Sequence, residues 1–270
     1  ADARAEFIEY DYSNRMISGN TREDGSKCGF GGCYYNRPSD RKDDFSEISA
    51  RAGITTTFER LNYFAQISLG FRPPQINEAY RLQKKQNVTD LDSETLTMLE
   101  IGSRFENDKV NGSISIYQSK KKNSIFRDAE NFIVDDGKTD HEGVELSLNW
   151  LINSDNTIST NLTYGDHRYD FETDTSMREK IRIGNKIDTS PRIMANLIWD
   201  LNLRDGSLLS FEIEHMSSYY TDAANLHEYD GHTLYHTRFN RDLSPSLKGF
   251  LRVDNIFDKA YAERADFNAF

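Results

Sequence analysis

The chain has 270 residues, of which 37% are hydrophobic and 29% charged, so it has little apolar material for one large globular core. Aromatic residues nevertheless reach 12%, which argues against a disordered chain. The longest apolar runs have three residues, as at 197–199, whereas a membrane-spanning helix needs about 20, so spanning helices are excluded. The net charge of -11 argues against a nucleic-acid partner, because phosphate binding needs a dense basic surface.

The two cysteines form a C-x4-C pattern. Cys28 and Cys33 lie in and beside a Gly-rich stretch, residues 25–32, and no histidine is close in the sequence to complete a metal site. A reactive pair and half of a zinc site are alternatives. We favour a small disulfide in a loop exposed to an oxidising compartment, and therefore expect a Cys28–Cys33 bond.

Apolar and polar residues alternate in segments of about ten residues, which is the periodicity of β-strands rather than of helices. In the segment 143–151, the apolar side chains that share one face are Val144, Leu146, Leu148 and Trp150. The polar side chains that take the other face are Glu145, Ser147 and Asn149. Because each such segment has one apolar and one polar side, the pattern predicts an all-β fold.

About eleven of these segments follow one another along the chain. They begin near Glu6, Ser46, Asn62, Thr95, Val110, Asp140, Thr157, Thr189, Ser207, Gly231 and Leu247. Long connections are predicted at residues 14–44, 72–94, 120–139, 169–188 and 218–230, and short ones at 60–61, 106–109, 153–156, 202–206 and 242–246. In an antiparallel meander alternate connections lie at the same edge, so we expect all long loops at one edge and all short turns at the other.

This asymmetry is typical of outer-membrane β-barrels, which combine short periplasmic turns with long extracellular loops. A sheet can enter a lipid bilayer only as part of a closed barrel, since every backbone polar group must be paired within the protein. We therefore expect the apolar face that contains Val144, Leu146, Leu148 and Trp150 to contact lipid, and the polar face to line an aqueous interior. Bacterial single-chain barrels have even strand numbers, so an odd count predicts further strands outside this chain.

Five stretches, in chain order, resemble the C-terminal barrel portion of TonB-dependent outer-membrane receptors. The strongest is Gly-Phe-Arg-Pro-Pro-Gln at residues 70–75, followed by Asn-Glu-Ala-Tyr at residues 77–80. The other similar stretches are residues 99–102, 141–146, 188–192 and 253–261. By this resemblance, residues 1–270 are identified as the C-terminal part of such a receptor barrel, and we expect the plug domain, the early strands and the last strand to lie outside it.

The resemblance implies a protein of the outer membrane of a Gram-negative bacterium that takes up a scarce nutrient, typically a ferric siderophore. This chain would supply barrel wall and ligand-binding loops, whereas the TonB complex would act through the plug domain. The expected partners are outer-membrane lipid, the small-molecule nutrient and the TonB complex. Neither enzymatic activity nor a cofactor is expected.

Five residues on the long-loop side are candidate ligand contacts. They are Arg72, Gln75, Tyr80, Arg81 and Gln83, which cluster after the third segment. Guanidinium groups and phenol rings suit anionic, planar ligands such as ferric chelates. Solvation of an ordinary loop is the alternative for each residue.

The sequence points to no catalytic or metal site. His232 and His236 share one face of a segment but would lie about 13 Å apart at strand rise, too far for joint ligation. Two other classes of function stay open. One is a small-barrel enzyme that uses a pair such as Asp166 and His167, or Asp230 and His232, and the other is a soluble secreted β-sandwich that binds carbohydrate.

Overall fold

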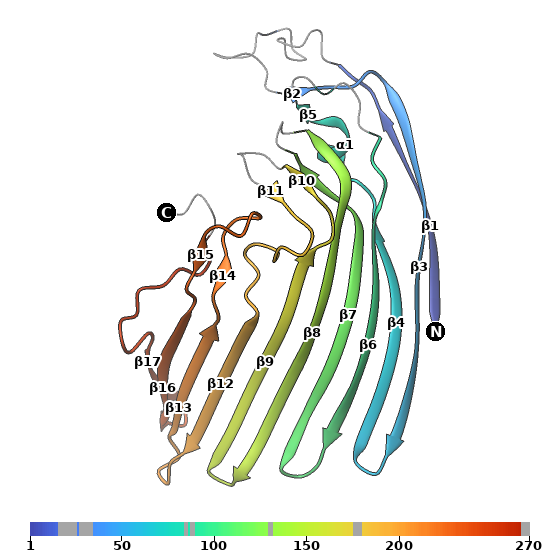
Figure 1. The fold of residues 1–270 in the computed structure, drawn as a ribbon. Coiled ribbons are helices and arrows are strands. Elements are labelled where there is room, and N and C mark those ends of the chain that lie inside the picture. The colour runs from blue at the N-terminus through green and yellow to red at the C-terminus, as the bar shows by residue number, and fades with distance from the viewer. Residues whose placement is uncertain are drawn as a thin grey trace.

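The computed structural model describes residues 1–15, 26, 35–83, 86, 90–128, 132–174 and 180–265. Eleven strands form one antiparallel sheet in which each strand pairs with its neighbours along the chain (Figure 1). The strands are β1 (Asp2–Tyr12), β3 (Arg41–Phe58), β4 (Leu61–Arg72), β6 (Glu94–Glu106), β7 (Val110–Arg127), β8 (Ile133–Asn153), β9 (Asn156–Tyr169), β12 (Ile193–Asn202), β13 (Leu208–Met216), β16 (His232–Ser244) and β17 (Leu247–Val253). The predicted all-β meander of about eleven strands is confirmed.

Smaller elements occupy the long connections. Three two-stranded ladders pair β2 (Tyr35–Asn36) with β5 (Leu82–Gln83), β10 (Thr173–Asp174) with β11 (Lys180–Ile181), and β14 (Tyr219–Tyr220) with β15 (Glu228–Tyr229). The helix α1 (Ile76–Tyr80) follows β4. Within the described ranges, no helix has the length and apolar character needed to cross a membrane.

The connections differ in length between the two ends of the sheet, as the sequence predicts (Figure 1). Short turns of two to five residues lie at one end, here called the turn end, and join β3 to β4, β6 to β7, β8 to β9, β12 to β13 and β16 to β17. A typical turn is held by Asn107, whose side-chain oxygen accepts hydrogen bonds of 2.9 Å from the amides of Lys109 and Val110. At the other end, here called the loop end, long connections comprise residues 13–40, 73–93, 170–192 and 217–231.

The long loop predicted at residues 120–139 is wrong. Strand β7 continues to Arg127 and β8 begins at Ile133, so only residues 128–132 join the two strands. Lys120 lies opposite Asp140 in this ladder, with 3.4 Å between its Nζ and the carboxylate. The backbone pairing continues past Lys120 through residues whose apolar and polar side chains no longer alternate, so the strand persists after the pattern that reveals it in the sequence has ended.

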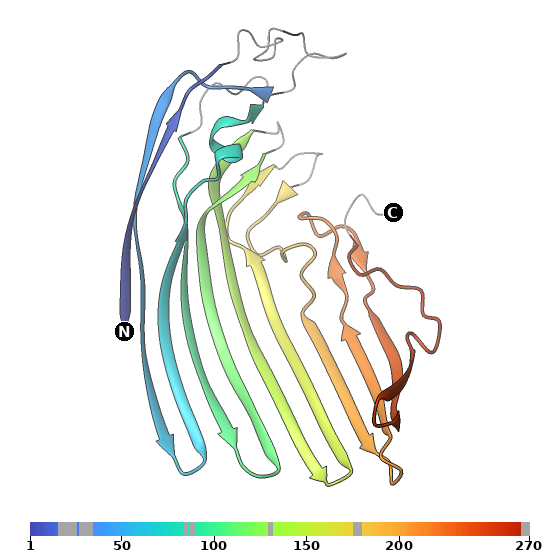
Figure 2. The same ribbon diagram turned by 180° about the vertical axis from the view of Figure 1, so that it is seen from behind.

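The sheet is a single curved layer (Figures 1 and 2). By strand register, one face is mainly polar and the other mainly apolar. Ser115 and Ser119 on the polar face are 7% exposed, whereas Ile116, between them on the opposite face, is 62% exposed. Side chains converge on the inside of a curved sheet and spread apart on the outside, so the polar face is the inner one. A single layer excludes the β-sandwich alternative, which needs two packed sheets.

Buried apolar side chains lie mainly at the loop end rather than on the sheet. Tyr80, Leu82, Tyr219, Ala223 and Ala265 are all at most 5% exposed. The first four lie in long connections, and Ala265, which follows β17, donates its amide N–H to the hydroxyl of Tyr219 over 2.7 Å. The apolar residues of the long strands are instead largely exposed. The core of the described chain therefore holds the loop end together, while the wall leaves its apolar face uncovered.

Candidate functional site

An apolar belt, here called the outer belt, covers the outer face of the sheet. Its exposed or half-buried side chains include Ile101, Ile114, Ile116, Val144, Leu146, Leu148, Trp150, Tyr164, Leu197, Trp199, Phe211 and Tyr235. The strand register makes the belt continuous, because Val144 lies opposite both Ile116 and Tyr164. An apolar surface that crosses many strands is unfavourable in water and suits a lipid environment. The contact of Val144, Leu146, Leu148 and Trp150 with lipid stays a prediction.

Aromatic side chains with polar tips border the outer belt at both ends. At the turn end, Trp199 packs 5.6 Å from Phe211 between ring centroids and donates its indole N–H to Asn156 over 3.0 Å. At the loop end, the hydroxyl of Tyr164 accepts a hydrogen bond of 2.7 Å from Arg192. Rings of this kind favour the level where hydrocarbon meets headgroups and water. Both ends of the outer belt therefore carry the aromatic side chains that are expected at the two interfaces of a membrane-spanning wall.

Polar side chains line the inner face at the same level. Gln66 donates to Glu100, and Asn196 donates to Glu212 over 3.1 Å. Glu145, Ser147 and Asn149, which the sequence pattern assigns to the polar face, lie on this inner face by register. Glu212 and Glu214 of β13 lie on the same face. Such a face suits the aqueous interior of a barrel.

Arg72, the first predicted ligand contact, binds two carboxylates of its own chain. Its Nε donates to Glu94 over 2.7 Å, and its two terminal nitrogens donate to Glu78 over 2.9 and 3.2 Å. Glu78 also accepts the backbone N–H of Gln75 over 2.6 Å. The guanidinium thus ties the end of β4 to the start of α1 and to the start of β6, and we call this group the arginine clamp.

Glu94 is the centre of the arginine clamp, and sequence reasoning missed it. Its side chain is 6% exposed and accepts hydrogen bonds from Arg72, from Lys121 at 3.0 Å and from the amide of Ile125 at 2.9 Å. Burial alone would raise the pKa of this carboxyl, but the three donors outweigh it and hold the pKa at about 2. Glu94 is therefore ionised at neutral pH. No sequence motif marks it, because its partners come from two other strands, Arg72 from β4 and Lys121 and Ile125 from β7.

Tyr80 anchors helix α1 to the first two strands of the sheet. Its hydroxyl donates to Asp43 over 2.7 Å, and its ring stacks on Tyr12 with centroids 4.3 Å apart. Burial and, after it, the hydrogen bond to Asp43 raise the pKa of Tyr80 above its usual value, so the phenol stays neutral. The hydroxyl of Tyr10 donates to the carbonyl of Pro74 over 3.0 Å and adds a second tie.

The remaining predicted ligand contacts lie around α1. Gln75 precedes the helix and is exposed, and Arg81 is exposed at its end, with its amide donating to Asn77 over 3.3 Å. Gln83 ends β5, where its backbone pairs with Tyr35. The structure thus brings the five residues into one segment at the loop end, and their contact with a ligand stays a prediction. Cys28 and Cys33 lie outside the described residues.

A pair of histidines on the inner face was also missed. His141 and His167 are opposite each other on β8 and β9, with their Nδ1 atoms 3.0 Å apart. Asp166 lies on the other face of β9, where it pairs with Lys186 and, over 2.9 Å, with Arg168. Asp166 and His167 therefore point to opposite sides of the wall and cannot act as one catalytic pair. Within the described ranges, no group of three or more His, Cys, Asp and Glu side chains could hold a metal ion.

An outer belt bordered by aromatic rings, behind a polar inner face, defines the wall of a transmembrane β-barrel. The family described as TonB dependent receptor-like, beta-barrel, matches residues 3–256. The chain belongs to this family, as its sequence motifs predict. A comparison with curated proteins gives no significant match.

Solved structures of similar fold include three transport proteins. The siderophore receptor PiuA from Acinetobacter baumannii has a TM-score of 0.68 and 18% identity, over 82% of this chain and 33% of that chain. The ferric yersiniabactin uptake receptor FyuA from Yersinia pestis has a TM-score of 0.66 and 17% identity, over 82% and 33%. The copper transporter OprC has a TM-score of 0.72 and 14% identity, over 96% and 40%. At these identities the likeness establishes the fold alone, and this chain spans about a third to two fifths of their length.

Proposed function

We propose that this chain forms part of the barrel wall and the external loops of an outer-membrane receptor that imports a scarce nutrient by TonB-dependent transport. The observation that carries the proposal is the inverted distribution of polarity in a chain of this family: the outer belt is exposed and the polar face is turned inward. A protein that functions in water gains nothing from such a surface. A receptor in the outer membrane of a Gram-negative bacterium needs it.

A ferric siderophore is the ligand that we propose. PiuA and FyuA, whose barrels resemble this chain, are named as receptors for a siderophore and for ferric yersiniabactin. The long connections at the loop end present exposed polar groups, among them Gln75 and Arg81, and guanidinium groups suit the negative charge of ferric chelates. OprC shares the fold and is named as a copper transporter, so the choice of ligand rests on loop chemistry rather than on the barrel.

The domain organisation that we propose follows from the family. The chain would form the C-terminal part of the barrel, and a plug domain elsewhere in the receptor would contact TonB. In this arrangement the loop end faces the cell exterior and the turn end faces the periplasm, as in other outer-membrane barrels.

Uptake of a radiolabelled ferric siderophore by iron-starved cells tests the proposal. Cells that lack the receptor gene should lose uptake of at least one siderophore, and the wild-type gene should restore it. Arg81→Ala should weaken siderophore binding by about tenfold, as expected for loss of one charge-assisted contact. Arg60→Ala, at the turn end, is the matched control and should bind like the wild type. Unchanged uptake of every siderophore tested in the deletion strain would contradict the ligand assignment.

A further inference from the structure

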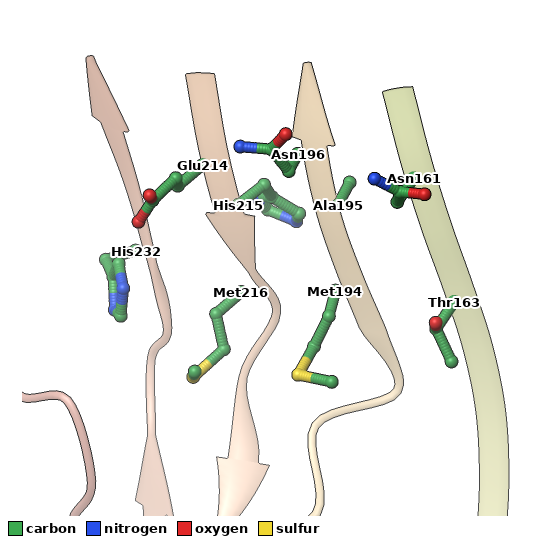
Figure 3. A pocket seen from close by; sticks show the side chains of 9 residues that line it. All are labelled: Asn161, Thr163, Met194, Ala195, Asn196, Glu214, His215, Met216 and His232. Atoms are coloured by element: carbon green, nitrogen blue, oxygen red, sulfur yellow. The ribbon is translucent and has the colours of Figure 1, made fainter. Parts of the chain in front are cut away.

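Two methionines and one histidine form a row on the inner face, close to the loop end of β12, β13 and β16. Met194 lies opposite Met216, and Met216 lies opposite His232. Opposite residues on adjacent antiparallel strands project from the same face, with Cβ atoms about 4.5–5.5 Å apart. The three side chains line an open hollow of about 280 Å³, and Figure 3 shows both thioether sulphurs at the same level of the wall.

The donor atoms of this row are soft. Thioether sulphur prefers Cu(I) among biological metal ions, and imidazole nitrogen also ligates copper. A methionine side chain has three rotatable bonds and adapts its sulphur position at little cost. Because the inner face is concave, Met194 and His232 can lean toward an ion held above Met216. Two sulphurs and one nitrogen then surround the ion.

The ring of His232 is held in an orientation that suits ligation. Its Nδ1 lies 2.9 Å from the hydroxyl oxygen of Tyr229, which also accepts the amide N–H of Ala262 over 3.1 Å. When Nδ1 donates to Tyr229, Nε2 carries the lone pair that a metal ion requires. A fixed outer partner of this kind is the usual companion of a ligating histidine.

We propose that Met194, Met216 and His232 form a binding site for a soft monovalent metal ion, Cu(I) or its analogue Ag(I), on the inner wall. The site is separate from the proposed import of a ferric chelate, because Fe(III) is a hard ion that prefers oxygen donors. The sequence prediction of no metal site considered pairs of histidines, and it did not weigh thioethers brought together by strand register.

Titration of the intact, detergent-solubilised receptor with Ag(I) in chloride-free buffer tests the proposal. We expect binding of one ion, and an affinity at least tenfold weaker in both Met194→Leu and Met216→Leu. Leucine keeps the size and apolar character of methionine but removes the sulphur, so folding should be preserved. Met98→Leu is the matched control: Met98 lies on the inner face of β6, opposite Ser68 and Ser119, and its loss should leave the affinity unchanged.

A second measurement needs no variant. Peroxide converts methionine to its sulphoxide, and a bound metal ion shields the sulphur from oxidation. Peptide mass spectrometry should show that Ag(I) slows oxidation of Met194 and Met216 at least fivefold and leaves Met98 unaffected. Equal Ag(I) affinity in the wild type and both leucine variants, or equal oxidation rates with and without Ag(I), would overturn the proposal. Neither measurement involves siderophore uptake, so failure of this site and failure of the proposed function are distinguishable.

Discussion

The exposed apolar face of β8 gives a sharp prediction about arginine substitutions. Leu148 lies in the middle of the apolar series on this strand, between Val144 toward the loop end and Ile152 toward the turn end. Ser147, its neighbour in sequence, points to the inner face. Leu148→Arg and Ser147→Arg therefore place the same charged side chain at nearly the same height, one toward lipid and one toward the barrel interior.

The expected loss of folding stability depends on how deep the substituted side chain lies in the bilayer. Leu148 is four positions from Val144, which is about 13 Å along the strand and about 10 Å in depth for a strand tilted by about 40°. Arginine on the lipid face of a barrel costs about 2–4 kcal/mol at the midplane and about 0–1 kcal/mol near an interface. Leu148→Arg should therefore lower the folding equilibrium constant by about 30-fold to nearly 1,000-fold, whereas Val144→Arg and Ser147→Arg should each change it by less than about fivefold.

Refolding of the intact receptor in lipid vesicles measures these differences. The folded fraction is obtained across a urea titration from the faster migration of folded barrels on unheated SDS gels, and the midpoints give the free energies of unfolding. Equal losses for Leu148→Arg and Ser147→Arg would refute the assignment of the two faces. A loss for Val144→Arg as large as that for Leu148→Arg would refute the depth profile.

Two further predictions concern the loop end. Because the pKa of Glu94 is held at about 2, below its ordinary value of 4.5, its stabilising contacts are complete above about pH 4.5 and are lost as the pH falls through about 2. Amide hydrogen exchange of β6 and the 73–93 connection should therefore differ between the wild type and Glu94→Gln at pH 5 and converge near pH 2. A difference in exchange that stays constant between these pH values would contradict this. Cys28 and Cys33 should resist alkylation until a reductant is added, and a mass increase without reductant would rule out the predicted disulfide.

The strand pattern could be predicted from the sequence wherever the wall separates two different environments. The observed end of β4 at Arg72 and the observed start of β7 at Val110 are those that alternation predicts, since one side of each strand is apolar and the other polar. The β7–β8 ladder beyond Lys120 could not be predicted in this way. Both faces of that hairpin are polar or mixed there, so backbone pairing continues without the pattern that would reveal it.

The candidate site was only partly predictable, because its contacts depend on register between distant strands. Arg72 stands out in the sequence, but its partner Glu94 is 22 positions away and becomes its neighbour only when β4 pairs with β6. The row of Met194, Met216 and His232 is likewise invisible until three strands are aligned. The residue types in the sequence indicate which chemical groups are present, but only the register between paired strands shows which of these groups are close enough to act together.

The arginine clamp changes how the strongest family motif of this chain is interpreted. Residues 70–80 contribute Arg72, which joins β4, α1 and β6, and Tyr80, which is buried against β1 and β3. Both side chains fix the position of the first connection after β4, and their polar groups are engaged within the protein. A loss of ligand binding in an Arg72 or Tyr80 variant would therefore report displacement of the whole segment rather than loss of a direct contact. The motif is thus better explained as a device that positions a binding loop than as the binding surface itself.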